Sequence, residues 1–195
     1  MGLVGVLVAI ALRTVTWLCV ASRRLRVPPP SRPERPHRCL DGYMTIEQEA
    51  SRVVSASREI AAPAERIFEL IADPALQPDW DGNDNLADAA TGQRVRQVGD
   101  VFTMTITQGS VRENHVTEFE EGHRIAWMPS EPGKQRPGHL WRWELDPVDA
   151  SRTRVTGTYD WTHLTDEARH ARAKATTTDR LQASLDRLAA LAEQS

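Results

Sequence analysis

The sequence has little cysteine and no clustered metal ligands. Both cysteines, Cys19 and Cys39, lie within the first 43 residues, so the rest of the chain has no disulfide and no thiol chemistry. It contains no C-x-x-C, H-x-x-x-H or H-E-x-x-H pattern, and its histidines are scattered. We therefore expect no metal site and no cofactor.

The common catalytic loops are also missing. There is no G-x-S-x-G elbow and no phosphate-binding loop, which excludes the commonest hydrolase and nucleotide-binding functions. The net charge is only −3, which argues against non-specific binding of nucleic acid. A length of 195 residues, with 40% hydrophobic and 26% charged residues, fits one globular domain with a substantial core.

Residues 1–43 differ from the remainder in composition. They carry seven arginines and two carboxylates, a net charge of +5, which leaves −8 for the rest of the chain. An apolar run over residues 2–22 is followed by arginines and then by a Pro/Arg-rich segment that resembles a linker. It is a poor secretory signal because no basic residues precede it.

Two interpretations of this leader remain open. Either residues 1–43 are an over-extended reading frame and Met44 is the natural start, or residues 2–22 anchor the protein in a membrane with the domain in the cytoplasm. We favour the first, and expect a cytoplasmic domain over residues 44–195. A membrane partner is expected only if the leader is real.

The strongest structural pattern is a predicted hairpin over residues 138–161, which holds three of the six tryptophans. Apolar and polar residues alternate in both limbs, as in strands with one buried face. The other face is charged and polar. The residues predicted to share the buried face are Trp141, Trp143, Leu145, Val155, Gly157, Tyr159 and Trp161.

The rest of the chain predicts an α+β order. A strand over 52–60 precedes a short helix that begins after Pro63 and ends at Asp73-Pro74, and a second helical turn covers 75–77. Strands follow over 102–106, 111–120 and 123–128, then a loop over 129–137 and the hairpin. A helix from about Thr165 to the C-terminus, with a kink or break near 176–178, completes the chain. Such an order predicts a helix laid across one face of a sheet.

Three segments resemble motifs of the START-like helix-grip superfamily (SRPBCC): 60–74 with the following Pro78 and Trp80, 116–127, and 153–161. The resemblance covers about residues 51–193. It implies a curved antiparallel sheet of about six to seven strands wrapped on a long C-terminal helix, with two short helices after the first strand. The superfamily includes polyketide cyclases/dehydratases, lipid-transfer domains and Hsp90-activator relatives, and its motifs specify the fold more strongly than the function.

A helix that grips a curved sheet leaves space for a ligand between them. For any single tryptophan an ordinary core position is the alternative. The set favours a cavity, because the facing helix offers mainly alanine and leucine, which have too little volume to meet so many rings. The predicted ligand-binding residues are Trp80, Phe102, Met104, Asn114, Trp127, Trp141, Trp143, Tyr159 and Trp161.

The polar candidates are less well defined. Asn114 and His115 are neighbours on one predicted strand, so only one of them can face inward. Val116 shares a face with Asn114, whereas Phe119 shares a face with His115, so alternation alone does not decide. His139 is predicted to be an exposed loop histidine, although it could act as a lid residue or an acid/base.

These features predict binding of an apolar or aromatic small molecule, lipid or polyketide-like. A cyclase/dehydratase-type enzyme without metal or cofactor is the alternative, and it would need an inward acid/base pair. A protein-interaction role like that of the Hsp90-activator relatives is a further alternative. It would need an apolar outer sheet face, and the charged residues expected there disfavour it.

Overall fold

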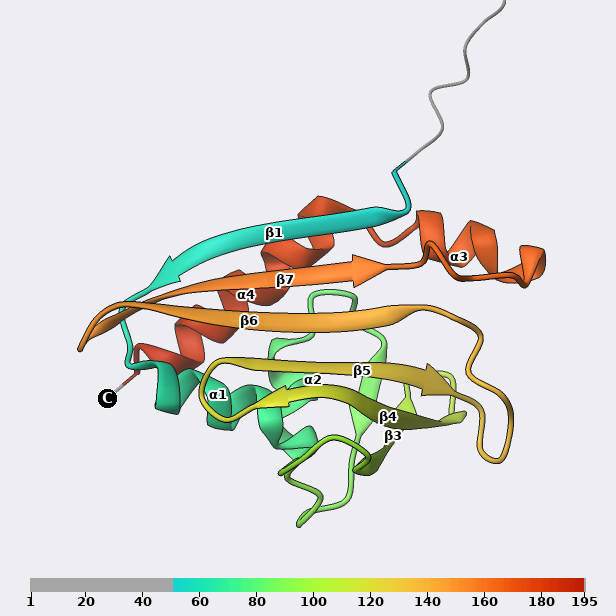
Figure 1. Ribbon diagram of the computed structural model, residues 1–195, viewed down its shortest axis with the longest axis horizontal. Helices are drawn as coiled ribbons and strands as arrows, with labels where there is room; N and C mark the ends of the chain where they lie inside the picture. The colour runs from blue at the N-terminus through green and yellow to red at the C-terminus, as the bar shows by residue number, and fades with distance from the viewer. Residues whose placement is uncertain (1–50, 195) are drawn as a thin grey trace, which may run out of the picture. The chain divides into compact units, whose positions relative to one another are not determined.

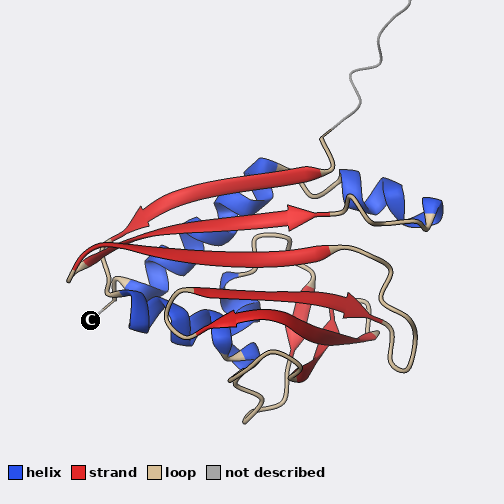
Figure 2. Ribbon diagram, viewed as in Figure 1, coloured by secondary structure: helices blue, strands red, loops and turns tan. Residues whose placement is uncertain are grey.

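The computed structural model describes residues 51–194, which form a seven-stranded antiparallel sheet with its helices against one face (Figures 1 and 2). The strand order is β1-β7-β6-β5-β4-β3-β2. The α+β helix-grip fold predicted from the sequence is therefore confirmed. The elements are β1 (Val53–Ile60), α1 (Ala64–Ala72), η1 (Pro74–Leu76), α2 (Gln77–Trp80), β2 (Leu86–Asp88), β3 (Val101–Ile106), β4 (Val111–Glu120), β5 (Arg124–Ser130), β6 (Leu140–Asp149), β7 (Arg152–Asp160), η2 (Glu167–Arg169), α3 (His170–Lys174) and α4 (Thr178–Ala192).

The predicted leader, residues 1–43, lies outside the described residues. Within residues 51–194, no helix has the length and hydrophobicity needed to span a bilayer.

The side chains of the β6–β7 hairpin point to the faces of the sheet that the sequence predicted. Trp141 pairs with Tyr159 and Trp143 pairs with Gly157 across the two strands. The six-membered ring of Trp143 lies over Gly157, where an added Cβ would come within 2.8 Å of it. The glycine in the second limb therefore makes room for the largest side chain in the first limb.

Strand β4 resolves the ambiguity between Asn114 and His115. Asn114 and Val116 are buried, whereas His115 is half-buried and its Nε2 lies 3.0 Å from Ser130 Oγ. A register shift in the pairing with β5, between Val116 and Glu118, then reverses the alternation. This irregularity also lets Phe119 pack inward against Phe68, with ring centroids 5.7 Å apart.

The C-terminal segment is two helices rather than one long one. The helix breaks between α3 and α4, next to the threonine run where a kink or break was predicted. Helix α4 crosses behind β1, β7 and β6 in Figure 1 and packs on α1 and α2 as well. Its Leu181, Leu185 and Leu188 are fully buried in the core.

Two boundaries differ from the predictions. Pro129 and Ser130 belong to β5, so the loop begins at residue 131. Both residues are buried, because strand pairing with β4 continues through them. The ambiguous segment 85–96 contains the short edge strand β2, which pairs with β3.

Candidate ligand-binding site

A cavity of about 150 Å³ lies on the helix side of the sheet. Seven of the nine predicted ligand-binding residues line it. They come from α2 and from five strands of the sheet, so the fold gathers residues far apart in the sequence. These seven are Trp80, Met104, Asn114, Trp127, Trp141, Trp143 and Tyr159.

Phe102 and Trp161, the other two predicted residues, are not among the residues that line this cavity. Phe102 is buried with its ring centroid 5.5 Å from that of Trp127, edge to face. Trp161 follows the end of β7, where the guanidinium carbon of Arg52 lies 5.1 Å from its ring centroid and His170 packs at 5.4 Å. Both rings belong to the core. The alternation of apolar and polar residues could not distinguish a core position from a cavity wall.

The cavity wall carries two polar nitrogens without a protein partner in the described part of the chain. These are the indole Nε1 of Trp143 and Nδ1 of His139, both fully buried. A buried polar group without a partner costs free energy, typically about 1–3 kcal/mol. Both nitrogens belong to residues that line the cavity, although neither atom has accessible surface of its own.

The expectation that His139 is an exposed loop residue was wrong. The preceding Gly138 has a φ of 101° and packs on the backbone of the turn after β7, where a Cβ would lie 2.0 Å from the carbonyl oxygen of His163. This close approach turns the loop end inward and places His139 in the cavity wall. Burial, with smaller contributions from the nearby Arg169, Arg172 and Arg112, lowers the pKa of His139 to about 4.

His139 and Tyr159 lie side by side, with ring centroids 5.9 Å apart. Burial raises the pKa of Tyr159 to about 12, while the charge of Arg172 opposes the increase. At neutral pH the imidazole and the phenol are therefore both uncharged. Together they give the cavity a polar wall without ionised groups.

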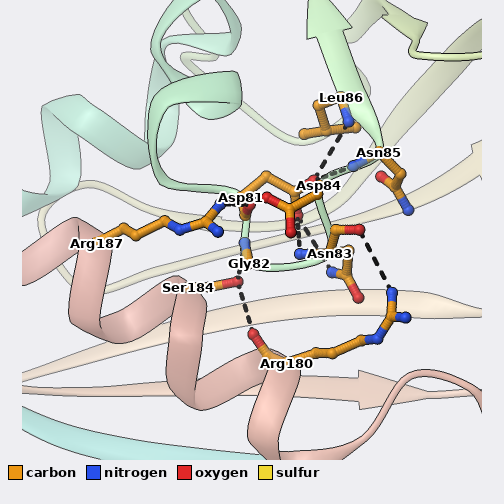
Figure 3. A network of polar contacts seen from close by, with 9 residues as sticks. All are labelled: Asp81, Gly82, Asn83, Asp84, Asn85, Leu86, Arg180, Ser184 and Arg187. Carbon is orange, nitrogen blue, oxygen red and sulfur yellow. Dashed lines mark hydrogen bonds and ion pairs between the residues drawn. The ribbon is translucent and has the colours of Figure 1, made fainter.

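The loop after α2 closes another side of the cavity and is fixed by Asp81 (Figure 3). The two oxygens of this buried carboxylate accept hydrogen bonds from the backbone N–H groups of Asn83, Asn85 and Leu86 at 2.9–3.3 Å, and from the Asn83 side chain. The N–H of Gly82 donates to Ser184 Oγ on α4 at 2.8 Å. Although Asp81 lines the cavity, its carboxylate is engaged in holding this loop.

Three arginines line the same cavity: Arg112 on β4, Arg169 in η2 and Arg172 on α3. Arg169 is paired with Glu131 at 2.6 Å and with Asp166 at 3.1 Å. Sequence reasoning missed all three. Arg112 could have been identified, because it is two residues from the predicted site residue Asn114 on β4 and therefore on the same face of the strand.

Across residues 51–194, no group of three or more histidine, cysteine, aspartate or glutamate side chains is arranged to hold a metal ion. The residues that line the cavity provide aromatic walls, neutral hydrogen-bonding groups and arginines.

Comparison with known proteins agrees with this architecture. An uncharacterised protein of Mycobacterium tuberculosis (strain H37Rv) is 31% identical over 111 residues, which cover 55% of this chain and 47% of the relative. The chain thus spans about half the length of the curated relatives that it matches.

Solved structures show the same fold at low sequence identity. The Zhui aromatase/cyclase from Streptomyces sp. R1128 aligns with a TM-score of 0.55 and 18% identity, over 73% of this chain and 93% of that one. A START superfamily protein from Mycobacterium smegmatis aligns with a TM-score of 0.51 and 18% identity, over 73% and 97%. At this identity the two structures show that the fold is shared. The family model described as polyketide cyclase/dehydrase and lipid transport matches residues 51–193, and the chain belongs to this family.

Proposed function

We propose that this domain binds a small apolar or aromatic molecule in the cavity described above. The observation that carries the proposal is the wall itself, where four tryptophans and Tyr159 line one cavity together with the polar Asn114 and Ser130. Apolar pockets with a few placed polar groups are the usual form of small-molecule sites. The family, which joins cyclases with lipid-transport proteins, supports a ligand of this character.

The cavity volume favours a ligand with one ring or a short chain. An engineered protein cavity of about 150 Å³ accommodates a molecule the size of benzene. Pockets for larger, drug-sized ligands enclose about 300–1,000 Å³. At 150 Å³, the present cavity suits a monocyclic aromatic better than a multi-ring polyketide or a two-chain lipid.

A cyclase/dehydratase-type enzyme is the second candidate, and the neighbouring His139 and Tyr159 favour it. A general base works best when its pKa lies near the working pH. The pKa of His139, about 4, makes it a weak proton acceptor at neutral pH, and Tyr159, at about 12, keeps its proton. Both groups are better suited to hydrogen-bond a ligand than to transfer protons, so binding remains the leading proposal.

The outer face of the sheet disfavours an interaction role like that of Hsp90 activators. Arg142 forms a two-pronged ion pair with Glu118, and Arg154 pairs with Glu59 at 3.0 Å. These half-exposed and exposed pairs give this part of the surface a charged character.

The test uses 4-methylbenzyl alcohol, a neutral monocyclic probe of suitable size. We expect saturable binding by calorimetry, and a change in the indole N–H resonance of Trp143 as the probe oxygen accepts its hydrogen bond. Trp141→Phe should weaken binding several-fold, because Trp141 lines the cavity. Trp161→Phe is the matched control: this tryptophan lies outside the cavity, so affinity should be unchanged even if stability falls. If neither this alcohol nor the matching acid, 4-methylbenzoate, binds the folded protein saturably, both the binding and the enzyme proposals are ruled out.

A further inference from the structure

The arginines of the cavity indicate the charge of its ligand. Building on the proposed binding function, we propose that the ligand is a small apolar acid, whose carboxylate pairs with Arg112 and Arg172 while its apolar part lies among the tryptophans. Arg112 and Arg172 both line the cavity, and the acidic side chains around it already pair with other groups.

Arg112 is on the cavity face of β4, in line with the buried Asn114 and Val116. Its Nη1 donates to the carbonyl oxygen of Val111 at 2.9 Å, and its other N–H groups have no acceptor among residues 51–194. Burial lowers the pKa of Arg112, and the positive charge of Arg172 lowers it further. A half-buried guanidinium that faces an apolar cavity beside a second cation favours binding of an anion.

The acidic groups around the cavity do not neutralise these two arginines. Glu131 and Asp166 both pair with Arg169, and the Asp81 carboxylate accepts hydrogen bonds from its own loop. Within the described residues, neither Arg112 nor Arg172 has a carboxylate within salt-bridge distance.

The two unpaired arginines come from different parts of the fold, one from the sheet and one from α3. A carboxylate between them can accept charge-assisted hydrogen bonds from each. Its negative charge would also offset the three cations that lower the pKa of His139. Binding of an acid should therefore raise the pKa of His139, whereas binding of a neutral analogue should not.

The experiment compares 4-methylbenzoate with 4-methylbenzyl alcohol, which share the ring and differ in charge. We expect the acid to bind about tenfold or more tightly, as charge-assisted hydrogen bonds allow, and its affinity to fall with added salt. Arg112→Gln and Arg172→Gln should each remove most of this advantage and change the affinity for the alcohol much less than the affinity for the acid. Arg154→Gln, on the outer sheet face, is the matched control. Titration of the His139 ring signals by NMR should show the increase in pKa only with the acid.

The outcomes distinguish a failure of this inference from a failure of the proposed binding function. If the alcohol and the acid bind equally, or if the two arginine variants keep the preference for the acid, the inference is wrong and the binding function stands. If neither probe binds the folded protein, the binding function itself fails. A preference for the acid that both cavity variants lose and Arg154→Gln keeps would support the inference.

Discussion

Acidification should destabilise this domain through His139. The pKa of this histidine is about 4 in the folded protein, against 6.5 for an ordinary histidine, mainly because the ring is buried. Between these two values the unfolded chain binds a proton that the folded protein does not. The free energy of unfolding should therefore be greatest above pH 6.5 and fall as the pH decreases towards 4.

The size of the effect follows from the shift. Each pKa unit corresponds to about 1.4 kcal/mol, so the difference between 6.5 and about 4 amounts to about 3 kcal/mol of unfolding free energy. This is a large share of the stability of a typical domain, about 5–15 kcal/mol. Other groups contribute at the acidic end: Asp149, with its pKa lowered to about 2 by hydrogen bonds from Ser151 and Arg152, loses its contribution mainly below pH 4. A variant that lacks only the histidine is therefore needed to isolate its contribution.

Urea unfolding, followed by circular dichroism from pH 7 to pH 4, provides the assay. The wild-type protein should lose about 3 kcal/mol more over this range than His139→Gln, whose side chain does not titrate. His123→Gln, in the exposed turn between β4 and β5, is the matched control and should keep the wild-type profile. Parallel profiles for wild type and His139→Gln would refute the burial of a neutral imidazole at this position.

Three further predictions concern stability. Leu185→Ala should reduce the free energy of unfolding by about 2–5 kcal/mol, because the side chain is fully buried in the core; a loss below about 0.5 kcal/mol in urea unfolding would mean that α4 does not grip the sheet there. Asp81→Asn should reduce the free energy of unfolding by about 1–3 kcal/mol, because its amide cannot accept all the hydrogen bonds of the loop. As the control, Asp84→Asn, at an exposed position, loses only the ion pair with Arg187 and should change stability little. Equal losses in the two variants would contradict this account. A shortened protein that starts at Met44 should unfold at the same urea concentration as the full chain; a lower midpoint would assign residues 1–43 a structural role.

The fold could be predicted because its main elements carry local periodic signals. Alternation in β6 and β7 placed Trp141 and Trp143 on the inner face, and their cross-strand partners are Tyr159 and Gly157, as the shared face implied. The break before α4 was also visible, in the threonine run. Such features depend on neighbours in the sequence, so a single chain contains the information.

The site was harder to predict because it depends on where that periodicity fails. The irregularity in β4 reverses which side chains point inward after Val116. The alternation of apolar and polar residues could not show where this reversal occurs. The inward turn at Gly138 depends on contact with the backbone of His163, 25 positions along the chain. Arg112 was missed for another reason, since an arginine on a strand is ordinarily assigned to solvent.

The break in the C-terminal segment also explains where the cavity lies. The sequence predicted a cavity because alanine and leucine on the facing helix seemed too small to meet the aromatic face, yet Leu181, Leu185 and Leu188 are fully buried. Helix α4 contributes only Ser184 to the cavity lining. The open space therefore adjoins the segment before α4, where η2 and α3 supply Arg169, Arg172 and Ala173 to the wall. A single unbroken helix would not give these residues the same placement, so the threonine run that weakens the helix also influences which residues line the cavity and which charges its wall carries.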